Sequence, residues 1–243
     1  MSALSRAAAL VVLALAQVAL AEVGHVSKLE GSATRTPKGG QPAALAEGTA
    51  IELGDTLAVK PGGALKFELT DGSVIALAEK STLTITEAEF EGQERKGFSG
   101  MLKGGSLWTK VKKALGGGKF EVTTERAVAG VRGPIFRIDA GTLVKAAGGR
   151  GRVASVVRVV EGVVAVRPSK LVARTIKGAV PPAKGKRVEV PGPREISADE
   201  WEARFVELQQ NTQIAVGVDL WEQAEYDAAA KRDAFATWLE KNP

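Results

Sequence analysis

The chain has 243 residues, of which 44% are hydrophobic and 25% are charged, and it contains one histidine and no cysteine. This composition is typical of a globular protein stabilised by burial and backbone pairing, and it excludes disulfides and cysteine-ligated metal sites. Because His25 has no cysteine to act with, we expect no catalytic residue, no metal site, no cofactor and a protein that is not an enzyme.

The charge is distributed unevenly along the chain. Residues 22–194 contain 28 Lys and Arg against 17 Asp and Glu, whereas residues 195–243 contain 4 against 11. A basic body of this kind either binds anionic polymers or satisfies its charges internally. We do not expect nucleic acid as a partner, because the basic residues are spread out and lack interleaved aromatic residues for stacking on bases.

Residues 1–21 have the features of a secretory signal peptide. Arg6 is followed by an uncharged run rich in Leu, Val and Ala, and small side chains at Ala19 and Ala21 precede the expected cleavage site before Glu22. The run has about fifteen residues, whereas a membrane-spanning helix needs roughly 20. We therefore expect no membrane span after cleavage and a periplasmic or secreted protein of a Gram-negative cell.

Residues 22–166 are predicted to form a β-rich body. Apolar residues fall at every second position, as in Leu65–Leu69, and glycine-containing turns separate the apolar runs. Asp71–Gly72, between two such runs, is typical of a tight hairpin. Many short strands predict a sandwich, a barrel or a β-solenoid, and their spacing alone does not choose among the three.

The remainder of the chain is predicted to be a connector and a tail. Residues 167–194 contain five of the 10 prolines and are expected to be extended. Residues 195–243 are expected to be a helical tail, because Ser197 and Glu200 form a capping box and the later apolar residues have helical spacing. The apolar faces of these helices either dock a partner or pack on the β body.

An ordered set of motifs runs through the β body and resembles a FecR domain. The motifs are Gly54–Asp55, Asp71–Gly72–Ser73, Gly105–x–Leu107–Trp108, Phe120–x–Val122–x–Thr124 and Val131–x–Gly133–x–x–Phe136. The resemblance covers residues 45–140, and the valine-rich segment 156–166 continues it. No single motif is specific, but their order is.

The resemblance implies a periplasmic β-rich module, β-solenoid-like or a twisted β-sandwich, here with a C-terminal α-helical tail. In iron-uptake regulators, FecR domains receive a signal from an outer-membrane receptor and pass it to an anti-sigma factor at the inner membrane. It therefore implies a non-enzymatic protein-interaction or signal-sensing module of the cell envelope, with an envelope protein or glycan as the partner. The oligomeric state is not predicted.

Two departures from the family pattern limit this transfer. Pro134 stands where the family usually has a threonine. Six residues precede the apolar run, whereas the regulators carry a cytoplasmic segment and a membrane helix there. We therefore expect an exported, stand-alone FecR-domain protein without the anti-sigma segment. The alternative is a structural envelope component whose basic body binds anionic cell-wall or outer-membrane polymers.

Two groups of residues are singled out by these arguments. The structural motif residues are Gly54, Asp55, Asp71, Gly72, Trp108, Val131, Gly133 and Phe136. The candidate partner contacts are Arg132, which either pairs internally or reaches a partner, and the tryptophans of the tail, Trp201, Trp221 and Trp238.

Overall fold

The structure is a computed structural model, which describes residues 22–112, 118–131, 134–145, 151–173, 206–218, 220–227 and 232–243. The predicted signal peptide lies outside these residues, as do the capping box, Trp201, Arg132 and Gly133. Within the described stretches, no helix is both long and apolar enough to cross a membrane.

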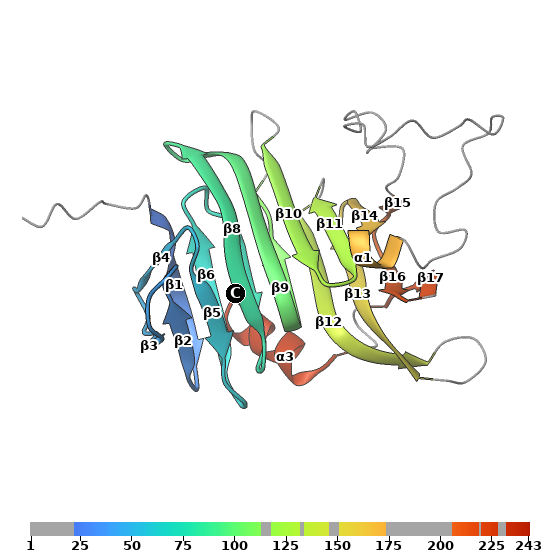
Figure 1. Ribbon diagram of the computed structural model, residues 1–243, viewed down its shortest axis with the longest axis horizontal. Coiled ribbons are helices and arrows are strands. Elements are labelled where there is room, and N and C mark those ends of the chain that lie inside the picture. Colours follow the sequence, from blue (N-terminus) through green and yellow to red (C-terminus); the bar gives the residue numbers. More distant parts are fainter. Residues whose placement is uncertain are drawn as a thin grey trace, which may run out of the picture.

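Two twisted β-sheets stack face to face (Figure 1). Sheet A contains, in order across the sheet, β4 (Ala50–Glu52), β1 (Glu22–Glu30), β6 (Ala64–Leu69), β7 (Val74–Leu77), β9 (Glu94–Lys110), β12 (Ile135–Lys145), β13 (Gly151–Glu161), β16 (Thr212–Gly217) and β17 (Leu220–Glu225). Sheet B contains β3 (Ala43–Ala44), β2 (Ala33–Thr36), β5 (Thr56–Val59), β8 (Thr82–Glu91), β9 again, β10 (Lys119–Thr124), β11 (Ala127–Val131), β14 (Val164–Pro168) and β15 (Val206–Leu208). A short helix, α1 (Lys170–Ala173), follows β14.

The long strand β9 belongs to both sheets. Its first part pairs with β8 and β10 in sheet B as far as Gly104, and from Gly105 onward it pairs with β12 in sheet A. Gly105 has a φ of 82°, and a side chain there would place its Cβ 2.5 Å from the Cα of Ser81. The strand can therefore change sheets only where a residue without a side chain allows it.

The hydrophobic core lies between the sheets and follows the predicted alternation. Leu65, Phe67 and Leu69 are all buried on one face of β6, as the period-two pattern predicts. The ring centres of Phe98 and Phe120, from neighbouring strands of sheet B, lie 4.8 Å apart. Each fully buried side chain of this size contributes about 1.5–3 kcal/mol, so aliphatic and phenylalanine burial supplies the main stabilising term.

A buried ion pair joins the start of β9 to the β6–β7 hairpin. Arg95 and Asp71 are 2% and 5% exposed, and the guanidinium donates hydrogen bonds to the Asp71 carboxylate and to Ser73 Oγ (2.9 Å). The Ser73 hydroxyl also donates to Asp71 (2.8 Å) and accepts from the backbone N–H of Lys112 (2.9 Å). Burial lowers the pKa of Arg95, and the charge of Asp71 offsets part of this effect. The motif Asp71–Gly72–Ser73 is thus an anchor as well as a turn.

The mainly β fold with a C-terminal helix is confirmed, and it is the twisted sandwich that the structure contains. The β-solenoid prediction is wrong. Among the described strands, neighbours pair antiparallel apart from β9 with β10, whereas a solenoid stacks parallel coils. Short strands and glycine turns are common to both architectures, so the sequence pattern does not separate them.

The predicted helical tail is wrong for residues 206–225, which form β15, β16 and β17. Asn211 has a positive φ of 61° at the turn before β16, and Ile214 and Val216 are buried at alternate positions. Because pairing with β13 and β14 satisfies the backbone and buries these side chains, tertiary contacts override the helical spacing. The helix is confirmed at α3 (Ala234–Lys241).

We expect Gly105→Ala to destabilise the fold. A side chain at a positive φ costs about 1–3 kcal/mol, and its Cβ would in addition collide with Ser81. Gly104→Ala is the control, because a Cβ at Gly104 meets no atom within 4 Å. Its free energy of unfolding should stay within about 0.5 kcal/mol of that of the parent chain. Urea unfolding of both variants measures the difference, and equal midpoints would show that the sheet crossing tolerates a side chain.

We expect Arg95→Ala to lower the free energy of unfolding by about 3–5 kcal/mol, since it leaves the Asp71 carboxylate buried without its partner. Lys96→Ala, one residue along the same strand, removes only exposed ion pairs with Glu91 and Glu94 and should leave the melting temperature unchanged. Thermal unfolding of the two variants measures this contrast. A small effect at Arg95 would mean that water enters and solvates Asp71.

Candidate functional site

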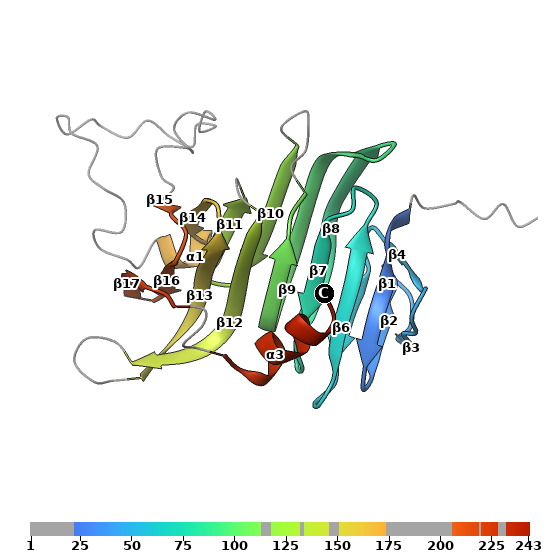
Figure 2. The same ribbon diagram turned by 180° about the vertical axis from the view of Figure 1, so that it is seen from behind.

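Helix α3 covers part of the outer face of sheet A, on the side opposite the core (Figure 2). The helix begins at Asp233, whose side chain accepts a hydrogen bond from the backbone N–H of Ala236 (2.8 Å) and so caps the first turn. Phe235 and Trp238 are buried on its inner face, against Ala64, Ala76 and the half-buried Trp108. The helix is therefore part of the folded body.

A charged network fixes the start of α3 to sheet A. Arg137, on β12, donates to Asp233 (2.7 Å) and to Asp139 (2.8 Å), and its guanidinium lies 5.4 Å from the ring centre of Phe235. Arg158, on β13, is paired with the other oxygen of Asp139. Burial would raise the pKa of Asp233, but the hydrogen bonds from Arg137 and Ala236 outweigh it and hold that pKa below its ordinary value. Asp233 is therefore charged at neutral pH and bound to the sheet.

The other end of α3 is fixed by a lysine of β6. The Lys66 ammonium donates to the carbonyl oxygens of Asn242 (2.9 Å) and Pro243. These carbonyls lie just beyond the C-terminal end of α3, where positive charge is favoured by the helix dipole. The helix is thus held at both ends by cations of sheet A.

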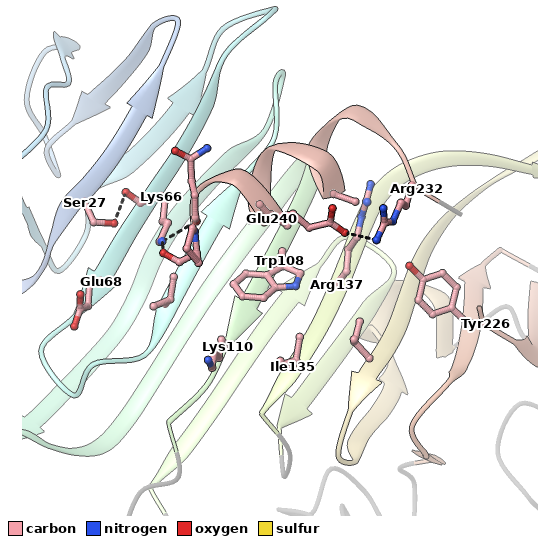
Figure 3. Close-up of a pocket in the computed structure, with 16 residues that line it drawn as sticks. Ser27, Lys66, Glu68, Trp108, Lys110, Ile135, Arg137, Tyr226, Arg232 and Glu240 are labelled. Atoms are coloured by element: carbon pink, nitrogen blue, oxygen red, sulfur yellow. Dashed lines mark hydrogen bonds and ion pairs between the residues drawn. The ribbon is translucent and has the colours of Figure 1, made fainter. Parts of the chain in front are cut away.

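A groove of about 750 Å³ lies between α3 and the exposed part of sheet A (Figure 3). Trp108 lies near its middle, and Lys110 and Ile135 lie further along the same face in the close-up. Its apolar lining comes from Val74, Trp108, Ile135, Val160, Ala236 and Leu239, and its charged lining from Lys66, Glu68, Lys110, Arg137, Arg232 and Glu240. The groove therefore has an apolar centre and a rim with charges of both signs.

A smaller polar pocket of about 310 Å³ adjoins the same face. Asp139, Arg158 and Tyr226 line it, together with Ser106, Arg137, Thr142 and Asp233. The Arg158 guanidinium lies 5.5 Å from the ring centre of Tyr226, and burial, with the nearby charge of Arg137, lowers the pKa of Arg158. The two arginines and two aspartates that line this pocket form ion pairs with each other, so we interpret their role as structural.

The arrangement suits binding of a protein segment. Specific interfaces have an apolar centre, a polar rim and tryptophan among the residues that contribute most to affinity, and the groove around Trp108 has these features. In the part of the chain that the structure describes, no group of three or more His, Asp or Glu side chains is placed to hold a metal ion.

The predicted structural motif residues lie at turns, in the core and in the groove. Gly54 has a φ of 90°, and the buried Asp55 accepts from the backbone N–H of Glu52 (2.7 Å) and from Arg35 Nε (2.5 Å). Gly72 has a φ of 79° in the hairpin. Phe136 is in the core, the half-buried Val131 packs against the core, and Trp108 lies on the outer face of sheet A.

The predicted partner contacts are not brought together. Trp238 is buried beneath α3 and Trp221 is half-buried against the core on β17, as the alternative of packing on the β body predicts. Arg132 and Trp201 lie outside the described residues. The groove instead uses Trp108, which the sequence identified only as a structural motif residue.

Sequence reasoning missed Arg137, Asp139 and Asp233. Arg137 and Asp139 alternate with the buried Phe136 and Ile138, so the period-two pattern places both on the outer face of the strand. That signal was available in the sequence. Their partner Asp233 is 96 residues from Arg137 in the chain, and only the fold brings it to them.

We expect the docking of α3 to weaken at acid pH. The pKa of Asp233 is lowered in the folded protein. Its contribution to the stability of the fold is therefore complete above the ordinary aspartate pKa, and it is lost as the pH falls through the pKa of the folded state. Asp233→Asn keeps a good N-cap but removes the charge. Its melting temperature should therefore lie below that of the parent chain at pH 7 and approach it at pH 3. If the difference in melting temperature between the parent chain and the variant stays constant with pH, the ion pair with Arg137 does not stabilise the docked helix.

Comparison with known proteins identifies the central part of the chain. Two crystal structures of a candidate anti-sigma factor from Parabacteroides distasonis, at 1.65 and 2.50 Å resolution, are similar at 18% identity with TM-scores of 0.46 and 0.47. The alignments cover 76% of this chain, which spans 64% and 63% of those structures, less than two thirds. A cell surface anchoring domain is similar over 25% of this chain and 80% of its own, at 28% identity and a TM-score of 0.25. No curated protein matches.

The family comparison agrees with the motif order in the β body. Residues 55–165 match the family model described as FecR protein. The match begins ten residues after the expected start at Leu45 and extends to include β13 and the first strand residues of β14. Residues 55–165 of the chain are therefore similar to the FecR protein family.

Proposed function

We propose that this chain is a non-enzymatic protein-interaction or signal-sensing module of the cell envelope, and that the groove around Trp108 binds a segment of its partner. The single observation that carries the proposal is the groove itself, which has a volume of about 750 Å³, an apolar centre and a charged rim, and which lies on a β-sheet. The FecR match supports a regulatory role rather than a catalytic one.

Export to the periplasm or the cell exterior is part of the proposal. It rests on the sequence of residues 1–21, which has the charge, length and small-residue end of a signal peptide. The mass of the mature protein, which should correspond to a start at Glu22, tests this part separately.

The rival function is a structural envelope component that binds anionic polymers through its basic body. The excess of Lys and Arg in residues 22–194 favours it. Arg137, however, is paired with Asp233, a carboxylate of the acidic residues 195–243. Acidic residues of the C-terminal part therefore neutralise part of the basic excess of residues 22–194.

Two lysines of β9 give a matched test of the groove. Lys110 and Lys103 are both exposed, but Lys110 lines the groove on sheet A and Lys103 precedes the crossing in sheet B. Because the chain has no cysteine, Lys110→Cys and Lys103→Cys each carry one photo-crosslinker. After illumination with envelope extract, we expect a saturable adduct of defined mass from position 110 and not from position 103.

Salt separates the two candidate functions in the same experiment. A partner held in the apolar groove should resist modest salt, whereas polymers held by exposed charges should be released. Equal crosslinking from both positions, or loss of every adduct at modest salt, contradicts the groove proposal and favours the rival.

A further inference from the structure

The hairpin of β12 and β13 projects beyond the body of the sandwich (Figure 1). The two strands pair as far as Lys145 and Gly151, and Leu143 lies directly opposite Val153 near this end. The last pair of β13 with β16 joins Ala154 to Gly217, and the guanidinium of Arg152 donates a hydrogen bond to the carbonyl oxygen of Val218 (3.4 Å). Leu143 and Val153 on the hairpin, with Val218 directly after the end of β16, form a group that we name the tip row.

The tip row is apolar and exposed. Leu143, Val153 and Val218 are 71%, 44% and 46% exposed, and they are three of the five large hydrophobic residues exposed in the described part of the chain. Exposed hydrophobic residues are usually scattered singly, so their concentration in one row at a projecting end is informative.

The tip row continues the inner face of sheet A. Along β13, Val157 and Val159 point into the core, and Val153 has the same parity. Leu143, as the cross-strand partner of Val153, lies on the same face. Further along the sheet this face is covered by sheet B, whereas the exposed fractions show that no described residue covers it at the tip.

Basic residues flank the tip row on β12 and β13. Lys145 is the last residue of β12, and Arg152 directly precedes Val153 on β13. Lys145 is exposed and shares the parity of Leu143, so it lies on the same face as the tip row. An apolar row with basic residues at its outer end matches an anionic lipid surface, in which aliphatic side chains enter the acyl boundary while cations contact headgroup phosphates.

We propose that the tip row with Lys145 is a contact site for the anionic surface of a membrane. Three side chains are far too small an area for a stable protein interface, which buries about 1,200–2,000 Å² in total. They suffice for weak, reversible attachment when electrostatic attraction is added. The site is separate from the groove around Trp108, which shares none of its residues, so a lipid contact and a partner contact can coexist.

Vesicle sedimentation of the chain from Glu22 to Pro243 tests the proposal. We expect binding to vesicles of phosphatidylcholine with phosphatidylglycerol, weakening as salt rises, and no binding to phosphatidylcholine alone. The double variant Leu143→Ser/Val153→Ser should weaken partitioning about tenfold or more, and Lys145→Gln about fivefold. Leu53→Ser is the matched control, because Leu53 is 42% exposed beside β4, at the opposite end of sheet A, and should partition as the parent chain does.

A spectroscopic readout locates the contact. A fluorophore sensitive to polarity, attached to Leu143→Cys, should shift to the blue when phosphatidylglycerol vesicles are added, whereas the same label at Leu53→Cys should not. Because these positions are exposed, unchanged melting temperatures will show that the variants are folded. Lack of binding to anionic vesicles, an equal loss with Leu53→Ser, or a label at 143 that shifts only with a protein partner overturns the proposal.

Discussion

The two sheets share one continuous backbone, because β9 hydrogen-bonds within sheet B up to Gly104 and within sheet A from Gly105. This constraint sets the position of most other elements. The start of the strand carries Arg95, which is buried against Asp71 and holds the β6–β7 hairpin, and its end carries Trp108 on the outer face of sheet A. A change in the register of β9 would exchange its core and outer residues in both layers at once.

The outer face of sheet A is where this scaffold meets its surroundings. Alternation along β9 and β12 sends Leu107 and Ile138 into the core and leaves Trp108, Arg137 and Asp139 outside. Helix α3 covers part of this face and is held by charges at both ends, so the part that stays open is bordered by a helix. The combination of a sheet as the floor, an aromatic centre and a charged rim is what a binding module requires.

Local patterns predicted the strands of the β body well. Leu65, Phe67 and Leu69 alternate because one face is buried, and Asp71–Gly72 turns because glycine tolerates positive φ, so both are readable from neighbouring residues. Apolar spacing gave the wrong prediction where the same residues fit two kinds of secondary structure. Residues 206–225 have apolar residues that fit either a helix or strands, and pairing with β13 and β14 decided for the strands β15, β16 and β17. The groove was missed because Trp108 and Leu239 are 131 positions apart in the chain.

The sequence by itself determined the β-rich body, the positions of its glycine turns, the similarity of its motifs to FecR domains and the absence of cysteine chemistry, because each depends on residue identity or on contacts between near neighbours. Only the tertiary structure decided that the strands form a sandwich crossed by β9, that Asp233 meets Arg137, and that Trp108 faces a groove while Trp238 is buried. These features depend on which strand lies beside which, and that choice is made by the burial of whole faces, a property of the assembled sheets and not of any single segment.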